Sequence, residues 1–265
     1  MIYVLLPAFN EESSLVPLIS SVSDTLTADG FAYHIIVCND GSTDRTAEVL
    51  AELSESYEFE VITHKINRGL GETARDLFER AAELATDDDA IVRLDADNTH
   101  EPHNIERLVA KLEEDYDVVT ASRFQAGGGQ TGVSRGRAVL SSMAQLFMKL
   151  VFGFWGMREF SCGFRAYRAS IIKRAIAFYG NNFIQLKGLG FTGTLEKLVK
   201  LKLLDARFGE VGFQLRYDKK TSSSKMIASI TTLGYLVMAI MYHWPFGGWR
   251  RNYRRKLAQR LSTSA

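Results

Sequence analysis

The chain has 265 residues, of which 46% are hydrophobic and 24% are charged, and its formal net charge is +1. This composition is typical of a globular protein with a substantial core, and the near balance of charges argues against recruitment of nucleic acid by a global electrostatic field. Cys38 and Cys162 lie far apart and fit no metal-binding spacing, so we expect both to be buried free thiols in a reducing compartment.

Residues 1–124 alternate short apolar runs with segments of helical periodicity. Strands that alternate with helices predict an α/β fold with a parallel sheet and right-handed crossovers. Asn10 is the expected N-cap of the first helix, and Pro102 is expected in the first turn of the fourth. The predicted strands are 2–9, 33–40, 59–65, 90–97 and 117–124, and the predicted helices are 10–26, 41–56, 69–85 and 101–115.

The following hundred residues have a weaker pattern. Residues 125–137 are rich in glycine and basic side chains, which predicts a mobile loop. The predicted elements after this loop are helices over 138–156, 162–176 and 191–204, and an extended segment over 206–218.

The C-terminal part has a different composition. Residues 226–244 contain no acid, lysine or arginine, and residues 245–256 form an aromatic and basic cluster. A helix lying in a membrane interface uses Trp, Tyr and a polybasic flank, so we favour an interfacial helix, with a spanning helix and a buried core helix as alternatives. We therefore expect residues 1–225 to form a catalytic domain, divided at residue 124, and residues 226–265 to form a membrane-associating segment.

Polar side chains follow the ends of several predicted strands. Ligands of open α/β sheets bind outside the carboxyl ends of the strands, where Glu11, Asp40, Asp95, Asp97 and Arg123 are expected. Two aspartates separated by a single residue in a strand point to the same side of it. Their carboxylates suit Mg²⁺ or Mn²⁺, which prefer oxygen ligands. The alternatives are a solvated strand end for the aspartates, a capped tight turn for residues 38–46 and a favourable helix N-terminal charge for Glu11.

Basic residues gather in two places of the second half. Arg123, Arg135 and Arg137 surround the glycine-rich segment, and residues 219–225 carry three lysines. Guanidinium groups bind phosphate through two hydrogen bonds, whereas lysine acts as a mobile point charge. Together with an acidic metal site they suggest two phosphates around one cation, although each is also compatible with a solvated surface.

Seven motifs occur in one order along residues 1–226, and as a set this order resembles family 2 glycosyltransferases, which are inverting enzymes with the GT-A nucleotide-sugar fold. Within that family it is most similar to the dolichol-phosphate mannosyltransferase branch and its bacterial polyprenyl-phosphate relatives. The motifs are "PAFNEE", "NDGSTDRT", "NRGLGETAR", "LDADNTHEP", "SRF", "CGFRAYR" and "SSSKM".

The resemblance implies roles for individual residues. Asp40 would accept a hydrogen bond from the base with Cys38 packed beside it, and Asp95 and Asp97 would hold Mg²⁺ or Mn²⁺ and the sugar diphosphate. The implied nucleotide-sugar-binding residues are Pro7, Phe9, Glu11, Cys38, Asp40, Asp95, Ala96 and Asp97. The implied acceptor phosphate-binding residues are Arg123, Arg135, Arg137, Lys219 and Lys225, with the departing diphosphate of the donor as the alternative contact of Arg123. The implied catalytic residues are Asp97, Arg123, Arg137 and Glu196.

Three positions, in two motifs, depart from the pattern of the branch. Relatives carry glutamine, a further ligand on the metal side, where Thr99 stands. Their late motif is arginine, two residues, glycine, one residue, serine and lysine, whereas this chain has Lys219, Ser222, Ser224 and Lys225 there. The third metal ligand and the phosphate contact at Lys219 therefore differ from those of the branch.

The resemblance implies transfer of a sugar from GDP-mannose or a UDP-sugar to a polyprenyl or dolichyl phosphate. The expected location is the cytoplasmic face of a membrane, peripheral or anchored by one C-terminal helix. An ionised phosphate acceptor needs no strongly tuned general base, which agrees with five histidines that form no recognisable acid–base pair in the sequence. The alternatives are a family 2 enzyme with a saccharide or protein hydroxyl acceptor, deprotonated by Asp97 or Glu196, and a non-catalytic nucleotide-sugar-binding protein.

Overall fold

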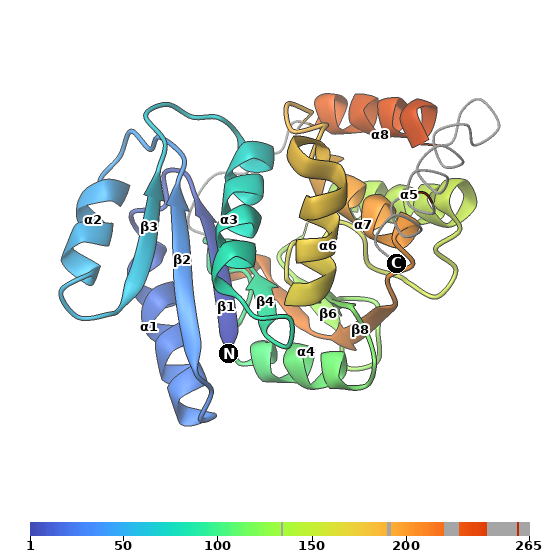
Figure 1. Cartoon of the computed structure of the whole chain (residues 1–265). Helices are drawn as coiled ribbons and strands as arrows, with labels where there is room; N and C mark the ends of the chain where they lie inside the picture. Colours follow the sequence, from blue (N-terminus) through green and yellow to red (C-terminus); the bar gives the residue numbers. More distant parts are fainter. Residues whose placement is uncertain (134, 190–191, 220–227, 243–258, 260–265) are drawn as a thin grey trace.

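A seven-stranded sheet of order β3-β2-β1-β4-β7-β5-β8 forms the centre of the computed structural model (Figure 1). The structure describes residues 1–133, 135–189, 192–219, 228–242 and 259. Its strands are β1 (Ile2–Ala8), β2 (Tyr33–Asn39), β3 (Phe59–Thr63), β4 (Ala90–Arg93), β5 (Val118–Ser122), β7 (Arg165–Arg168) and β8 (Phe208–Gly212). A separate parallel pair joins β6 (Gly129–Thr131) to β9 (Gln214–Arg216).

Helices cover both faces of the sheet. They are α1 (Leu15–Ala28), α2 (Thr46–Leu53), α3 (Leu70–Leu84), α4 (Asn104–Glu113), α5 (Arg135–Phe152), α6 (Ala169–Tyr179), α7 (Thr192–Leu203) and α8 (Ala228–Tyr242), with 3-10 turns η1 (Gly180–Asn182) and η2 (Tyr217–Lys219). Successive side chains of a strand point to opposite faces, so β1 contributes Val4 and Leu6 to the core under α1, α2 and α4, and Tyr3 and Leu5 to the core under α3, α6 and α7. Both faces of β1 are therefore buried, as expected of a central strand covered by helices on both sides.

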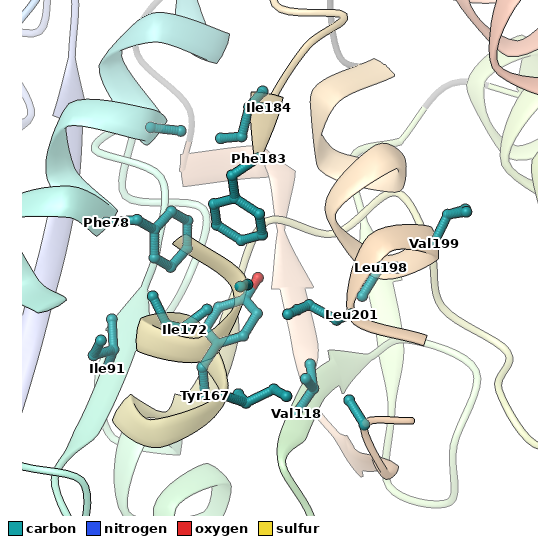
Figure 2. Close-up of a cluster of buried hydrophobic side chains, with 14 of the residues drawn as sticks. Phe78, Ile91, Val118, Tyr167, Ile172, Phe183, Ile184, Leu198, Val199 and Leu201 are labelled. Carbon is teal, nitrogen blue, oxygen red and sulfur yellow. The ribbon is translucent and has the colours of Figure 1, made fainter. Parts of the chain in front are cut away.

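The core under α3, α6 and α7 is rich in aromatic side chains (Figure 2). The rings of Phe78 and Tyr167 meet edge to face with their centroids 5.2 Å apart, and Phe183 lies 6.1 Å from Phe78. This packing fixes the helices on which one side of the site is built.

The predicted mixed α/β fold is confirmed, and β1 to β4 pair in parallel as expected. The predicted helix over 162–176 is partly wrong, because Arg165–Arg168 form β7, which is antiparallel to both β4 and β5. Residues 165–167 are buried between those two strands, so the sheet satisfies their backbone groups and the helix begins only at Ala169.

Several element ends differ from the prediction. The strand predicted over 90–97 ends at Arg93, so Asp95 and Asp97 lie in the loop after it, which turns through Asn98 at φ 60°. Asn10 is not an N-cap: it has φ 52°, and α1 begins at Leu15. Pro102 precedes α4, which begins at Asn104.

The predicted loop over 125–137 contains β6 and the first turn of α5, and that helix spans 135–152 instead of 138–156. At the C-terminus, α8 packs on α7 and stacks Tyr235 on Phe147 of α5, with ring centroids 5.8 Å apart. In the described part of the chain, no helix has the length and apolar character needed to cross a membrane. The predicted boundary at residue 225 and the basic cluster over 245–256 lie outside the described residues.

Candidate functional site

A cavity of about 670 Å³ opens at the carboxyl ends of β1, β2, β4 and β5. The loops after those strands supply one wall, and α5, α8 and the segment before α7 supply the other. It brings together most of the predicted site residues: Pro7, Phe9, Glu11, Asp40, Asp95, Ala96, Asp97 and Arg123. The side chains of Arg135, Arg137 and Lys219, and Lys225 as a whole, lie outside what the structure describes.

Asp95 and Asp97 are held in different ways. Arg93 donates from Nη2 to Oδ1 of Asp95 at 2.5 Å. Thr99 donates to Oδ1 of Asp97 from its hydroxyl at 2.6 Å and from its backbone N–H at 3.2 Å. Thr99, which also lines the cavity, thus orients the carboxylate of Asp97.

Within the described residues, no three acidic, histidine or cysteine side chains gather closely enough to hold a metal ion by themselves. The two aspartates line the same cavity of about 670 Å³. Mg²⁺ characteristically uses one or two carboxylates and completes its octahedron with water and substrate phosphates. This donor set therefore fits a hard divalent cation that arrives with its nucleotide.

Arg93 is buried at the end of β4, and its guanidinium fills the space beside Gly163. A Cβ atom on Gly163 would lie 1.5 Å from Arg93 Nη1. A larger residue than glycine at this position would therefore require the Arg93 guanidinium, which donates to Asp95, to move.

His100 also lines the cavity, although the sequence did not single it out. The backbone N–H of Asp95 donates to its Nδ1 at 3.1 Å, so the proton of the neutral ring is on Nε2, 3.6 Å from the Cys162 sulfur. Burial lowers the pKa of His100 below its usual value despite Asp95 and Asp97 nearby, and this favours the neutral ring. Burial raises the pKa of the Cys162 thiol to about 12, so neither group is a strong acid or nucleophile.

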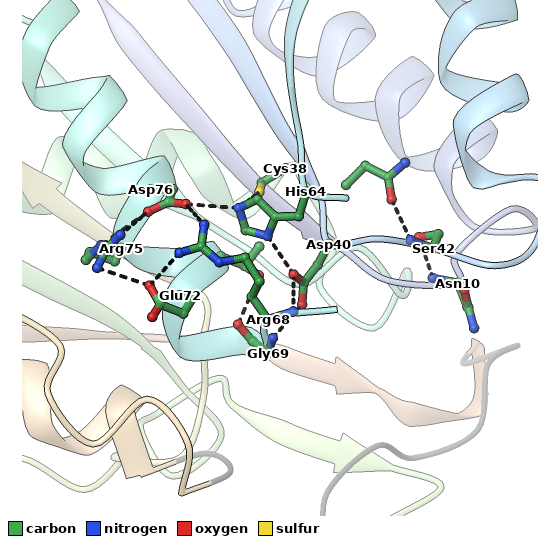
Figure 3. Close-up of polar contacts among 12 residues, drawn as sticks. Asn10, Cys38, Asp40, Ser42, His64, Arg68, Gly69, Glu72, Arg75 and Asp76 are labelled. Atoms are coloured by element: carbon green, nitrogen blue, oxygen red, sulfur yellow. Dashed lines mark hydrogen bonds and ion pairs between the residues drawn. The ribbon is translucent and has the colours of Figure 1, made fainter. Parts of the chain in front are cut away.

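Asp40 lies at the end of β2 and contacts the loop between β3 and α3 (Figure 3). Its Oδ1 accepts from the backbone N–H of Arg68 and its Oδ2 from that of Gly69, both at 2.8 Å. His64 lies behind it, with Nδ1 at 2.6 Å from Oδ1 of Asp40. A contact between residues so far apart in sequence leaves no local signal, and the sequence analysis did not pair this histidine with an acid.

Gly41 allows the loops after β2 and β3 to approach closely. It has φ 64°, and a Cβ atom there would lie 2.3 Å from the carbonyl carbon of Ile66. Asn10 joins the loop after β1 to the same region, because its Oδ1 accepts from the backbone N–H of Thr43 at 2.8 Å. These contacts fix the wall on which Asp40 lies.

Arg123 lies after β5 and is held by an acid that the sequence analysis did not identify. Glu159 accepts from Arg123 Nε at 2.7 Å and from Nη2 at 3.0 Å. Ser161 and Gln130 accept from Nη2 and Nη1. Although burial alone would lower the pKa of Arg123, the charge of Glu159 raises it above its usual value, so the guanidinium stays charged at the cavity.

Two predicted residues do not line the cavity. Cys38 is buried behind it, 3.6 Å from His64 Nε2, and burial raises the pKa of this thiol to about 12. Glu196 is fully buried and accepts from the backbone N–H groups of Gln185 and Leu186 at 2.9 and 2.8 Å and from the Tyr242 hydroxyl at 2.6 Å. The structure therefore does not place this carboxylate where a base acting on an acceptor would be.

Two cations at the cavity were not predicted as site residues. Arg68 and Lys187 both line it, and both contact Glu72 of α3. The "NRGLGETAR" motif contained the signal for Arg68, whereas Lys187 lies in a segment without a recognisable motif.

The chain matches the family model described as "Glycosyl transferase family 2" over residues 3–175. It is 31% identical over 194 residues to undecaprenyl-phosphate 4-deoxy-4-formamido-L-arabinose transferase of Pseudomonas aeruginosa, covering 72% of this chain and 54% of that protein. The same enzyme of Salmonella paratyphi B is 33% identical over 169 residues, covering 64% and 49%. The chain thus spans about half the length of these curated relatives.

Solved structures share the fold. Glucosyl-3-phosphoglycerate synthase of Mycobacterium tuberculosis, in complex with Mn²⁺, UDP and phosphoglyceric acid, has a TM-score of 0.60 and 20% identity over 90% of this chain and 78% of its own. The same protein with Mg²⁺ and UDP has a TM-score of 0.56 and 20% identity, covering 99% and 79%. At this identity the likeness establishes the fold alone.

Proposed function

Because the chain belongs to glycosyl transferase family 2, we propose that it transfers a sugar from a nucleotide-diphosphate sugar to a polyprenyl phosphate at a membrane surface. The observation that carries this proposal is the single cavity that joins Asp40, the two aspartates after β4 and Arg123. The names of the relatives support a polyprenyl-phosphate acceptor.

In this proposal the donor lies along the loops after β1, β2 and β4. Asp40 receives the base, and Asp95 and Asp97 hold the Mg²⁺ or Mn²⁺ that accompanies the diphosphate. When bound, the cation stabilises the negative charge that develops on the departing diphosphate. Thr99 and Arg93 keep the two carboxylates oriented, which is the protein's contribution to a preorganised site.

Arg123 provides the contact for the acceptor phosphate. The contacts from Glu159, Ser161 and Gln130 occupy four of its five N–H groups, so the described residues leave one Nη1–H for a phosphate oxygen. A phosphate is ionised near neutral pH and needs no base, which is consistent with the occupied Nδ1 of His100 and with the absence of Glu196 from the residues that line the cavity. Arg135, Arg137, Lys219 and Lys225 remain part of the proposal as further phosphate contacts.

Exposed apolar side chains support a membrane surface as partner. Val139, Met143, Leu146 and Leu150 recur at helical spacing along α5, and each is 59–62% exposed. The neighbouring α8 exposes a second apolar set, which consists of Leu233, Leu236 and Ile240, each 54–59% exposed. Both helices also line the cavity, through Ser141 and Ala144 of α5 and Thr232 and Tyr235 of α8. A lipid phosphate would thus reach the site from the surface on which its tail lies.

The test is incubation with Mn²⁺ and a panel of labelled nucleotide sugars, with and without a polyprenyl phosphate. We expect label to enter the lipid fraction for at least one donor, only when the lipid phosphate is present. Transfer to saccharide or protein hydroxyls instead would favour the alternative acceptor class. Label that stays on the donor in every combination would contradict a transferase and favour a nucleotide-sugar-binding protein.

A further inference from the structure

The imidazole of His64 lies between two carboxylates behind the cavity wall (Figure 3). Its Nδ1 is 2.6 Å from Asp40 Oδ1, and its Nε2 is 2.9 Å from Asp76 Oδ2. The side chains of His64 and Asp40 are each only 4% exposed. Because a carboxylate oxygen accepts hydrogen bonds, we assign the short contact to Asp40 as a hydrogen bond donated by Nδ1–H of His64.

His64 is fixed from its other side as well. Asp76 also accepts from Arg68 Nη1 at 3.2 Å and from Arg75 Nη2 at 2.9 Å, so it is itself anchored to α3 and to the loop before it. The buried Cys38 sulfur lies 3.6 Å from Nε2. These neighbours hold the ring in place and keep Nδ1 directed at Asp40.

The hydrogen bonds to Asp40 can be counted. An ionised carboxylate offers about four acceptor positions, two on each oxygen. Among the described residues, His64 and the Arg68 N–H occupy both positions of Oδ1, and the Gly69 N–H occupies one position of Oδ2. Asp40 therefore has one acceptor position left for a ligand, on Oδ2.

We propose that His64, by occupying Oδ1 of Asp40, makes the base site selective for uracil over guanine. The inference rests on the proposed function, in which Asp40 receives the base of the donor. Uracil presents one N–H on its hydrogen-bonding edge, between two carbonyl groups, and matches one open acceptor. Guanine presents two adjacent donors, N1–H and the N2 amino group, which a carboxylate pairs only with both of its oxygens available.

The experiment compares the dissociation constants of UDP and GDP, measured by calorimetry in the presence of Mn²⁺. We expect the full chain to bind UDP at least about tenfold more tightly, because guanine leaves one donor without a partner in a buried site. In His64→Leu, which frees Oδ1, the GDP/UDP ratio should fall towards one. His64→Asn, whose amide N–H lies near the position of Nδ1, should keep most of the preference.

His34→Asn is the matched control. This histidine lies at the opposite end of β2, 3.7 Å from Glu60, and its replacement should leave the ratio unchanged. UDP methylated at N3 gives a test that needs no variant: without its N–H it should bind the wild-type chain at least about tenfold more weakly than UDP.

Equal affinity for UDP and GDP in the wild-type chain would overturn the proposal, and so would unchanged binding of the methylated nucleotide. A ratio that stays high in a folded His64→Leu variant would show that His64 does not control the choice of base. Binding of neither nucleotide would contradict the proposed function itself, an outcome distinct from the loss of base preference.

Discussion

Asp95 and Asp97 differ in their surroundings although one alanine separates them. One oxygen of Asp95 is bound by the buried Arg93, whereas one oxygen of Asp97 accepts from Thr99 in its own turn. The first carboxylate is thus held by the sheet and the second by a local loop. Replacements at the two positions are therefore expected to differ in their cost to folding.

Asp97→Asn should lower sugar transfer by about 100-fold or more with little change in melting temperature. In the proposed mechanism the amide removes a negative charge from the place where the cation and the departing diphosphate would bind, but it can still accept from Thr99. Initial rates at saturating Mn²⁺ measure the effect, with the exposed Asp88→Asn as the control. Wild-type turnover in Asp97→Asn would remove this residue from the proposed catalytic set.

Gly163→Ala should destabilise the fold and loosen the contact between Arg93 and Asp95. The new Cβ atom would lie 1.5 Å from Arg93 Nη1, and overpacking of this kind costs about 1–3 kcal/mol. Urea unfolding measures the free energy. Gly156→Ala, where a Cβ atom meets nothing within 4 Å, is the control and should be neutral. Equal stability of both variants would mean that Arg93 moves aside at no cost.

At the scale of elements, the strands and helices of the first half were predictable because hydrophobic periodicity is a local signal. The four-residue β7 was not, since "RAYR" has no distinctive period and becomes a strand only between β4 and β5. The pairings of His64 with Asp40 and of Arg123 with Glu159 were missed for a related reason. They join segments 24 and 36 residues apart, and only the fold brings them together.

The site was predictable where it follows strand ends. Glu11, Asp40, Asp97 and Arg123 all line one cavity, as the topology of an α/β sheet requires. Glu196 was placed by resemblance alone, and its contacts instead join α7 to α8 and to the segment before α7. A motif-based placement is thus less reliable than one that also has a topological reason.

Tyr242→Phe should weaken the attachment of α8 to α7. The hydroxyl of this buried tyrosine donates to the fully buried Glu196 at 2.6 Å, and loss of such a partner costs about 1–3 kcal/mol. Thermal unfolding followed by circular dichroism measures the loss. Tyr33→Phe, which removes a part-buried contact with Ser23, should cost less. An unchanged melting temperature in Tyr242→Phe would show that Lys200 and the backbone satisfy Glu196 without the tyrosine.

Leu146→Glu and Leu236→Glu should each weaken binding to anionic phospholipid vesicles by about tenfold, because each removes one apolar contact of the α5 and α8 surface from the bilayer. Flotation of the full chain with vesicles measures the bound fraction. Val16→Glu on α1 replaces an equally apolar side chain, 51% exposed, on a different helix and should have no effect. Equal binding by all three variants would exclude this surface as the membrane contact.

At the scale of the whole molecule, α7 contributes three buried charged residues to the core. Glu196, Lys197 and Lys200 are all buried, and Lys200 pairs with Glu196 at 2.7 Å. Lys197 instead packs over the ring of Phe78 at 4.6 Å. Burial, together with the charges of Arg93 and Arg165, lowers the pKa of Lys197 well below its usual value. At this group the folded protein consequently binds fewer protons than the unfolded chain between the lowered folded pKa and about pH 10.4.

Stability should therefore rise with pH between the lowered folded pKa of Lys197 and its higher unfolded value. The gain attributable to this group approaches about 1.4 kcal/mol per pH unit, and it is lost as the pH falls towards the folded pKa. Urea unfolding of wild type and Lys197→Met from pH 7.5 to 9.5 measures it as the difference between the two curves. Parallel curves would show that Lys197 is charged in the folded protein.

The antiparallel direction of β7 determines where the segment between β5 and β7 begins and ends. Residues 123–164 connect the end of β5 to the start of β7 at Arg165. Because β7 runs opposite to β5, both ends of this segment lie at the edge of the sheet that carries the cavity. This segment includes Glu159, β6 and α5, and it contains no strand of the seven-stranded sheet. The pairing of β7 with β5 thus sets where this segment begins and ends, while its interior supplies part of the cavity wall and contributes Met148, Phe154 and Phe160 to the core.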